Sequence, residues 1–306
     1  MSVDLAFRGV IGKLYEAARL HAGKPLSEAA SEAIVSRDPE HVMIVTGFKV
    51  LPTMVQETDG PPGALVLAKT LRCLGVDVSL GIEEESVSIL EAGLEVLNIK
   101  CPIIPLPSNV DLSALSRRAF EEKGIDLLIF VEKAGSNNNG VYHNMLGVDV
   151  TRYHARAEAL LNEGRLRGCC VISIGDGGNE VGFGLIKDAV ERHVSKGKDC
   201  GCPCRGGIAA CSKADLVVTS STSNIGCYAV SCALSALKGG SWFYRGDLEV
   251  KLIRALIEAG AIDAMTGREE MMVDGVPVEV TASIVELMNY MSVKAKSAPN
   301  NQGYRG

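Results

Sequence analysis

Short runs of β-branched and aliphatic residues alternate with segments of helical periodicity along most of the chain. The runs end in glycine or polar residues, as buried strands do. We expect strands at residues 41–47, 76–82, 101–106, 125–133, 168–177, 208–211 and 215–221, and a hairpin across Asp274-Gly275 at 269–280. Apolar residues at helical spacing predict helices at residues 62–74, 83–97, 111–123, 151–163, 180–196, 224–237, 247–260 and 283–294.

This alternation of strands and helices predicts a three-layer α/β domain. Parallel strands need long crossover connections, which helices usually supply. We therefore expect a mostly parallel, Rossmann-like sheet with helices on both faces. Ligands of such open sheets bind beyond the carboxyl ends of the strands. Polar residues that directly follow a buried strand are therefore the candidates for chemistry.

Two more helices are predicted before the first strand, at residues 3–20 and 26–35, and Pro39 ends the second. We interpret residues 1–40 as an N-terminal helical arm that packs on the main domain. Residues 41–295 form a single α/β domain in this interpretation. The polar tail, residues 296–306, is expected to be disordered.

Composition narrows the class of protein. The chain has 306 residues, 31 of them basic and 37 acidic, for a net charge of −6, and 47% of its residues are hydrophobic. This argues against a disordered chain, and the lack of a long basic run argues against a nucleic-acid or anionic-membrane partner. We find no apolar stretch of membrane-spanning length and no signal-peptide pattern. The chain has ten cysteines but is too long for a small secreted disulfide scaffold, so we expect reduced thiols and a cytoplasmic location.

The first two strand ends are unusually polar. After the first strand the chain reads TGFKVLPTMVQETDGPPGA, and Pro61-Pro62 can begin the next helix because early helical positions need no N–H group. Capping and a rigid turn are the structural alternative to a ligand site there. A solvated loop is the alternative at the second strand end, which reads FVEKAGSNNNGVYHNMLG. The candidate residues of these two segments are Thr46, Gly47, Glu57, Asp59, Glu132, Lys133 and Asn144.

The next two strand ends are rich in glycine, serine and asparagine. The segment SIGDGGNEVGFG resembles a phosphate-binding turn, but Glu180 occupies the third glycine position of the dinucleotide fingerprint. We expect its glycines to admit a small polar ligand to the backbone, with Asp176 and Glu180 aimed into the cleft. In TSSTSNIGCYA, either Ser223 or Asn224 is expected to cap a helix whose free N–H groups suit a carboxylate ligand.

Four cysteines lie close together in the sequence, at Cys200, Cys202, Cys204 and Cys211. Three interpretations of this cluster remain open. It could bind zinc or an iron–sulfur cluster, have a redox or disulfide role, or be a loop without function. The spacing differs from the Cys-x2-Cys pairs of ordinary structural zinc sites. The five histidines show no ligand spacing among themselves, and only His143 lies in a candidate site.

Several of these segments together resemble the D-glutamate cyclase family. They are TGF followed by ETDGPPGA, EKAG with NGVYHNMLG, GDGGNE, SNIGCYA and MMVDGVP, in family order over about residues 41–285. Members convert D-glutamate to 5-oxo-D-proline and water. The resemblance implies a lyase of hydro-lyase type whose catalytic domain is residues 41–295.

The residues suit that chemistry, which needs an acid and a base but no organic cofactor. We expect Asp176 and Glu180 to be the acid and the base, and Lys133 to bind or polarise a substrate carboxylate. The amides of Gly177 and Gly178 are candidates for an oxyanion site. The expected substrate-binding residues are Thr46, Gly47, Glu57, Asp59, Glu132, Asn144, Gly177, Gly178, Asn179, Ser223 and Asn224.

Two alternatives stay open at this point. A divalent cation, Mg²⁺ or Mn²⁺, would be held by Asp59, Asp176 and Glu180 and act as the Lewis acid. A non-enzymatic protein that binds an acidic metabolite or a nucleotide would use the same cleft. The expected partner is an acidic amino acid, and a homo-oligomer is left open.

Overall fold

The sheet predicted from the sequence is present and all its strands run parallel. The computed structural model describes residues 4–6, 8–240 and 242–297. Six strands pair in the order β5-β4-β1-β6-β7-β8. Their bounds are β1 His41–Gly47, β4 Asp77–Glu83, β5 Ile103–Leu106, β6 Leu127–Lys133, β7 Cys170–Gly175 and β8 Leu216–Thr219. The expectation of a three-layer, parallel α/β fold is confirmed.

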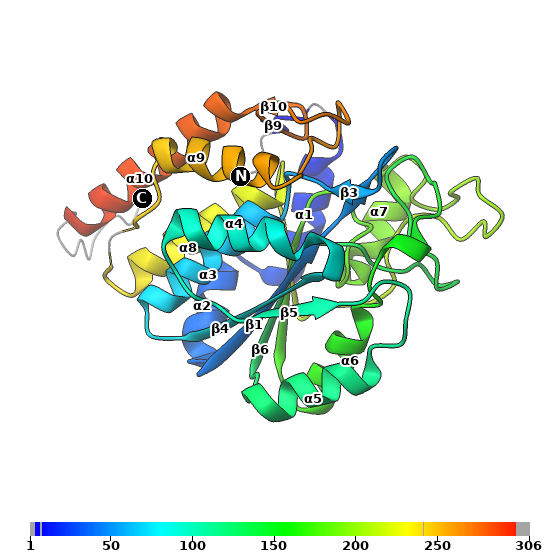
Figure 1. The fold of residues 1–306 in the computed structure, drawn as a ribbon, viewed down its shortest axis with the longest axis horizontal. Helices are drawn as coiled ribbons and strands as arrows, with labels where there is room; N and C mark the ends of the chain where they lie inside the picture. The colour runs from blue at the N-terminus through cyan, green and yellow to red at the C-terminus, as the bar shows by residue number, and fades with distance from the viewer. Residues whose placement is uncertain (1–3, 7, 241, 298–306) are drawn as a thin grey trace.

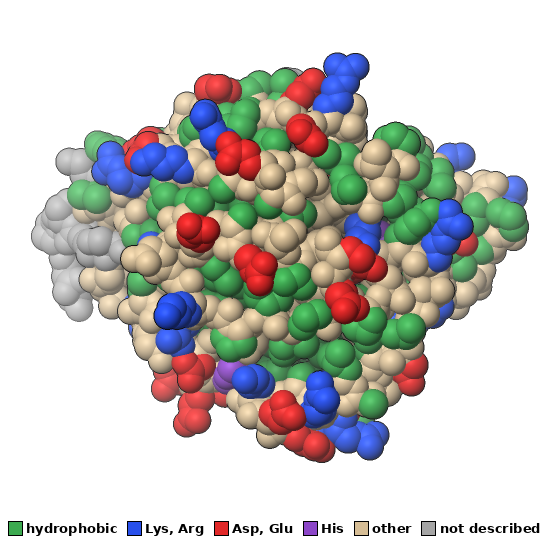
Figure 2. All heavy atoms as spheres, in the orientation of Figure 1, with side chains coloured by type: hydrophobic (Ala, Val, Ile, Leu, Met, Phe, Trp, Pro, Cys, Tyr) green, Lys and Arg blue, Asp and Glu red, His purple; other side chains and the backbone are tan. Residues whose placement is uncertain are grey.

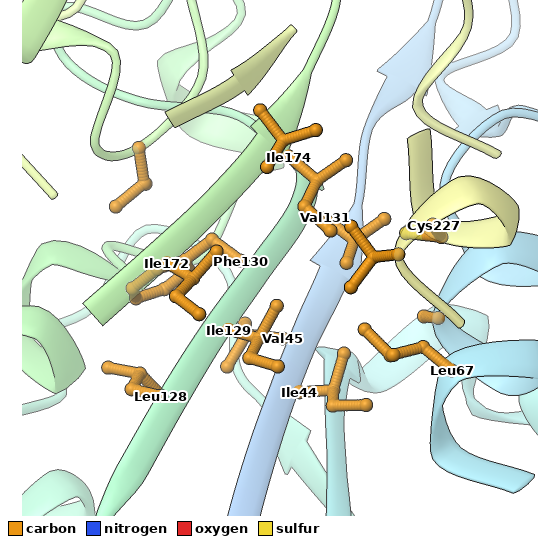
Figure 3. Packing of buried hydrophobic residues seen from close by; sticks show 14 of the residues in the cluster. Ile44, Val45, Leu67, Leu128, Ile129, Phe130, Val131, Ile172, Ile174 and Cys227 are labelled. Carbon is orange, nitrogen blue, oxygen red and sulfur yellow. The ribbon is translucent and has the colours of Figure 1, made fainter. Parts of the chain in front are cut away.

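Helices cover both faces of this sheet (Figure 1). On one face lie α3 (Pro61–Cys73), α4 (Val87–Leu97) and α8 (Ser223–Leu237), with α9 (Gly246–Glu258) and α10 (Val278–Ser297) packed outside them. On the other face lie α5 (Ser113–Lys123) and α6 (Glu158–Leu166). Strand β6 is buried along its whole length, which is why its first five residues, 127–131, are apolar without alternation. Figure 3 shows part of the resulting core, including Ile44 of β1, Val131 of β6, Leu67 of α3 and Cys227 of α8.

The N-terminal helices α1 (Ile11–Ala22) and α2 (Leu26–Arg37) lie at the β8 end of the sheet. Leu14 and Ala18 of α1, with Leu26, Ala30 and Ile34 of α2, belong to the same core cluster as the sheet. The first helix begins at Ile11 and not near residue 3 as predicted. At the other end of the chain, Lys296 and Ser297 lie in α10 and not in a tail. Residues 298–306, where disorder was expected, lie outside the described residues.

Three further predicted elements differ from the structure. Residues 208–211 form no strand, because Ala210 and Cys211 donate their N–H groups to loop carbonyls at Gly178 and Ser136. The helix expected at 180–196 is reduced to the short helices η3 (Gly184–Ile186) and α7 (Lys187–His193). The helix expected at 151–163 begins late, with η2 (Thr151–Tyr153) preceding α6. Loop contacts supply the backbone hydrogen bonds that a longer strand or helix would have made.

Two small hairpins complete the fold. The predicted hairpin across Asp274-Gly275 is present as β9 (Met272–Val273) and β10 (Val276–Pro277). A second hairpin, β2 (Lys49–Val50) with β3 (Val55–Gln56), was not predicted. Within the described residues, no helix has both the length and the apolar character needed to span a bilayer. Acidic and basic side chains are interspersed on the face that Figure 2 shows.

Candidate active site

A cavity of about 520 Å³ opens beyond the carboxyl ends of the strands. Strand β1 lies where the strand order reverses, since β4 and β5 extend the sheet on one side and β6, β7 and β8 on the other. Such a switch point is where open α/β sheets bind ligands. The polar and charged residues that line the cavity are Arg8, Glu57, Glu132, Asn144, Asp176, Asn179, Ser195 and Asp274, and apolar side chains such as Phe48, Leu51, Met145 and Met265 complete its wall.

Glu132 reaches the cavity because the end of β6 is irregular. Thr46 of β1 pairs with Val131, but Gly47 pairs with Lys133, so Glu132 is an extra residue in the ladder. Its backbone has a positive φ of 43°, an uncommon conformation for a side-chain-bearing residue. Bulges of this kind re-aim side chains next to functional sites. The hydroxyl of Ser223 then donates to Glu132 Oε2 at 2.5 Å and fixes the carboxyl group.

Arg8 supplies the positive charge of the cavity. Its Nη1 lies 2.7 Å from Asp176 Oδ1, and its Nη2 lies 2.5 Å from Asp274 Oδ2. The segment before α1 is held in place by Leu5, whose N–H donates to Ser221 Oγ at 2.7 Å. Burial works against the charged form of Arg8, but the two carboxylates outweigh it and raise the arginine pKa well above its usual value.

The carboxyl groups around Arg8 hold their protons more tightly than usual. Burial, followed by the charge of Asp274, raises the pKa of Asp59 to about 7. Burial likewise raises the pKa of Asp176 to about 7 and that of Asp274 to about 8, against the opposing effect of Arg8. Burial and neighbouring carboxylates raise the pKa of Glu57 and Glu132 well above the usual value. Groups that titrate near neutrality are suited to exchange protons with a ligand.

Glu180 does not face the cavity. Its Oε1 accepts the N–H groups of Asp176 and Gly177, both at 2.7 Å, and its Oε2 accepts that of Gly178 at 2.6 Å. The amides expected to stabilise an oxyanion are therefore already occupied. Glu180 is a buried organiser of the turn that carries Asp176, and this placement gives no support to its expected role as acid or base.

Lys133 points away from the cavity as well. Its ammonium pairs with Glu83 Oε1 and donates to the carbonyl of Gly47 at 3.3 Å, and its side chain is fully buried. Burial alone would raise the pKa of Glu83, but Lys133 and then His154 outweigh it and lower the pKa to about 2. The lysine therefore balances a buried carboxylate behind the site, whereas Arg8 lines the cavity.

The backbone N–H groups at the N-terminus of α8 also have hydrogen-bond acceptors within the chain. Asp59 accepts the N–H of Ser223 at 2.7 Å and that of Asn224 at 2.9 Å, so neither group is free for a carboxylate ligand. The cap is Thr222, which accepts the N–H of Ile225 at 3.3 Å, and not Ser223 or Asn224. Asn224 instead accepts the N–H groups of Gly60 and Gly63 at the start of α3. That helix begins at Pro61, as predicted.

The predicted site residues thus fall into two groups. Those that line the cavity are Glu57, Glu132, Asn144, Asp176 and Asn179. Those that lie behind its wall are Thr46, Gly47, Asp59, Lys133, Gly177, Gly178, Glu180, Ser223 and Asn224. Sequence reasoning missed Arg8, which no local pattern marks. It also missed Asp274, although the predicted hairpin turn and the MMVDGVP segment both contain it.

One cluster of three carboxylates is suited to a hard divalent cation. Asp59, Asp176 and Asp274 each offer an oxygen, and these three atoms lie within 4.8 Å of one another. Oxygen donors of this kind are what Mg²⁺ and related ions prefer. A second group contains Glu180, whose oxygens already accept three N–H groups. Asp274 thus stands in this cluster where Glu180 was expected, and both oxygens of Asp59 also accept N–H groups, those of Ser223 and Asn224.

Comparison with known proteins places the sequence in a family. Residues 1–289 match the family described as D-glutamate cyclase-like, C-terminal. The chain is 31% identical over 252 residues to "D-glutamate cyclase, mitochondrial" from Homo sapiens, a match that covers 78% of this chain and 38% of that protein. The chain thus spans well under half of the length of that relative.

Two solved structures show only distant likeness. A short-chain dehydrogenase/reductase from Serratia marcescens is 14% identical with a TM-score of 0.32, covering 83% of this chain and 91% of that one. MurG of Acinetobacter baumannii is 17% identical with a TM-score of 0.30, covering 51% of this chain and 40% of that one. Scores this low carry no functional argument. The family match and the relative identify the chain as a member of the D-glutamate cyclase-like, C-terminal family.

Proposed function

We propose that this protein is a lyase that converts D-glutamate to 5-oxo-D-proline and water. Two things support the proposal: membership of the family, and one feature of the cavity. That feature is a set of buried carboxyl groups with pKa values near neutrality, gathered around the Arg8 guanidinium. An acidic amino acid brings both a group for Arg8 to bind and protons for the carboxyl groups to move.

The reaction moves two protons within one molecule. The α-ammonium of glutamate must lose one proton before its nitrogen can attack the γ-carboxyl carbon, and it loses the second as the amide forms. The C–N bond forms, the C–O bond breaks, and the departing oxygen takes up two protons and leaves as water. Because amine and carboxyl group belong to one chain, binding needs only to select the conformer in which they meet.

The cavity residues divide these tasks. Arg8 binds a substrate carboxylate, since its guanidinium fork matches carboxylate geometry. Asp176 and Asp274 accept and return the protons, because each changes charge close to neutral pH. Glu180 is a positioning residue that fixes the turn carrying Asp176.

A divalent cation would relieve the excess of negative charge in this cavity. Glu57, Glu132, Asp176 and Asp274 line it, and among its described lining residues Arg8 is the one lysine or arginine. With the ion bound, Asp59, Asp176 and Asp274 would hold Mg²⁺ or Mn²⁺ as carboxylates and would no longer exchange protons with the substrate. Such an ion supplies Lewis-acid polarisation of a carboxylate.

The test is incubation of the purified chain with D-glutamate or L-glutamate, with Mg²⁺ or Mn²⁺ and with a chelator. Chiral chromatography should detect 5-oxo-D-proline from D-glutamate in preference to the L enantiomer. D-Aspartate is the matched control, because it has the same charges but could close only a strained four-membered ring. Absence of product from both enantiomers in every arm would exclude the proposal. Thermal stabilisation by glutamate without product would then favour a binding protein.

A further inference from the structure

A second cluster of potential ligands lies outside the carboxylate site. Cys200, Cys202 and Cys204 lie in the loop between α7 and β8, and His143 lies in the loop that follows β6. One ligand atom from each of the four lies within 4.8 Å of all the others. The cysteines are free thiols, and Cys200 and His143 are buried.

We propose that these four residues bind one zinc ion that ties the two loops together. The proposal is independent of the cyclase activity, because none of the four residues lines the cavity. Three thiolates and one imidazole are a known donor set of structural zinc sites, which use four protein ligands and leave no position for substrate.

The distances fit a single tetrahedral ion. Cys200 Sγ lies 3.2 Å from Cys202 Sγ and 3.5 Å from Cys204 Sγ. His143 Nε2 lies 3.2 Å from Cys202 Sγ and 3.5 Å from Cys204 Sγ. Zinc–sulfur and zinc–nitrogen bonds of ordinary length place tetrahedral ligands about 3.5–3.8 Å apart. The atoms of these four pairs need to move apart by only a few tenths of an ångström to accept the ion, and the other two pairs of ligand atoms lie within 4.8 Å.

The fourth ligand is His143 and not Cys211, the last cysteine of the sequence cluster. The thiol of Cys211 lies against the carbonyl of Asn137 at 3.5 Å and is not part of the group. An iron–sulfur cluster is disfavoured because its protein ligands bind different irons and so stand farther apart than four ligands of one ion. Soft thiolates also disfavour Mg²⁺ and Ca²⁺.

The surroundings of the sulfurs suit thiolates. The N–H of Cys204 donates to Cys202 Sγ and the N–H of Gly206 donates to Cys204 Sγ, both at 3.4 Å. The amide of Asn137 donates to Cys204 Sγ at 3.4 Å and to the carbonyl of Gly207 at 2.7 Å. Hydrogen bonds from outside the ligand shell orient metal ligands in this way.

The position of the cluster indicates what the ion would do. The carbonyl of His143 accepts a hydrogen bond at 2.8 Å from Asn179, which lines the carboxylate cavity. Asn144 and Met145, the next residues after His143, line it as well. A zinc ion on His143 would therefore hold one wall of the cavity against the cysteine loop.

The experiment measures metal in the untagged full chain, purified under reducing conditions without chelator. Inductively coupled plasma mass spectrometry should find about one zinc per chain. Cys202→Ser and His143→Asn should lose most of it, while Cys73→Ser, which changes an exposed thiol far from the cluster in sequence, should keep it. Replacement of zinc by Co²⁺ should give the intense visible bands of tetrahedral cobalt and the near-ultraviolet bands of thiolate ligation.

The cobalt spectrum of the unmodified chain keeps the test decisive even if a variant fails to fold. Absence of stoichiometric metal, both as purified and after zinc is added to the reduced chain, would overturn the proposal. Stoichiometric copper in place of zinc would overturn the assignment of the ion. A disulfide among Cys200, Cys202 and Cys204, found by mass spectrometry of the alkylated chain, would also contradict it.

Discussion

Glu180→Gln and Asp176→Asn should separate the stability of the site from its chemistry. In the native turn the Glu180 carboxylate accepts three N–H groups, those of Asp176, Gly177 and Gly178. A glutamine keeps one oxygen for the first two N–H groups but directs its own NH₂ at the N–H of Gly178. At least one buried donor, the N–H of Gly178, is then left without an acceptor, and the remaining bonds lose their charge assistance.

The cost of Glu180→Gln follows from these contacts. An unsatisfied buried donor costs about 1–3 kcal/mol, and each of two bonds that loses its charge assistance weakens by about 1 kcal/mol. Removing a buried charge offsets part of this, since burial raises the pKa of Glu180. We expect a net loss of about 2–4 kcal/mol in the free energy of unfolding. With an unfolding entropy of about 0.6 kcal/mol per kelvin for a chain of this length, Tm falls by about 3–6 °C.

Asp176→Asn is the matched variant, because it changes a neighbouring carboxyl group that lines the cavity. It removes one buried negative charge while Arg8 keeps its contact with Asp274, so stability should change by less than about 1–2 kcal/mol. Turnover should fall by about 10²-fold or more, as for a general acid or base.

The assay combines thermal and denaturant unfolding at pH 7 with 5-oxoproline formation at a temperature where both variants are folded. The folded Glu180→Gln variant should keep most of its turnover. If its Tm stays within about 1 °C of the parent, the reasoning from the three N–H groups is wrong. If Asp176→Asn keeps near-normal turnover, Asp176 is not a catalytic residue.

Two further predictions concern charge in the cavity. The raised pKa values of Asp59, Asp176 and Asp274 mean that the folded chain binds more protons than the unfolded chain, so stability should fall as pH rises from about 4 to about 8. Unfolding curves measured across that pH range check the expected fall in stability. The Asp274→Asn variant should show a shallower fall, because it lacks one of the three carboxyl groups. A Tm that is flat or rising between pH 6 and 8 would contradict the prediction. Arg8→Met should raise the KM for D-glutamate by about 10–100-fold, the range expected for a hydrogen bond to a charged group. Arg8→Lys should restore part of the loss by keeping the charge without the fork, and an unchanged KM in Arg8→Met would remove Arg8 from substrate binding.

The cysteine loop illustrates the limit of sequence spacing. Cys200, Cys202 and Cys204 could be grouped from the sequence because they are nearly adjacent. The histidine that completes the set precedes Cys202 by 59 positions, a separation that resembles no short zinc motif. Its proximity to the thiols results from the packing of two loops against each other.

The sequence by itself determined the alternating elements and the strand ends at which polar residues gather. Apolar runs without alternation marked strands buried on both faces, and Pro61 marked the start of α3, because these signals depend on local geometry and burial. The sequence also contained the family motifs and indicated Glu57, Glu132 and Asp176 as candidate site residues.

Only the tertiary structure decided which polar groups line the cavity and which form hydrogen bonds or ion pairs with each other. Glu180, Asp59 and Lys133 carry the residue types that chemistry needs, yet each is occupied by partners within the chain. Arg8 carries no local signal and lies 266 positions from Asp274, yet the two side chains meet in the cavity. The physical reason is that a buried polar group must find its partners in space, and those partners are fixed by how distant segments pack and not by their spacing along the chain.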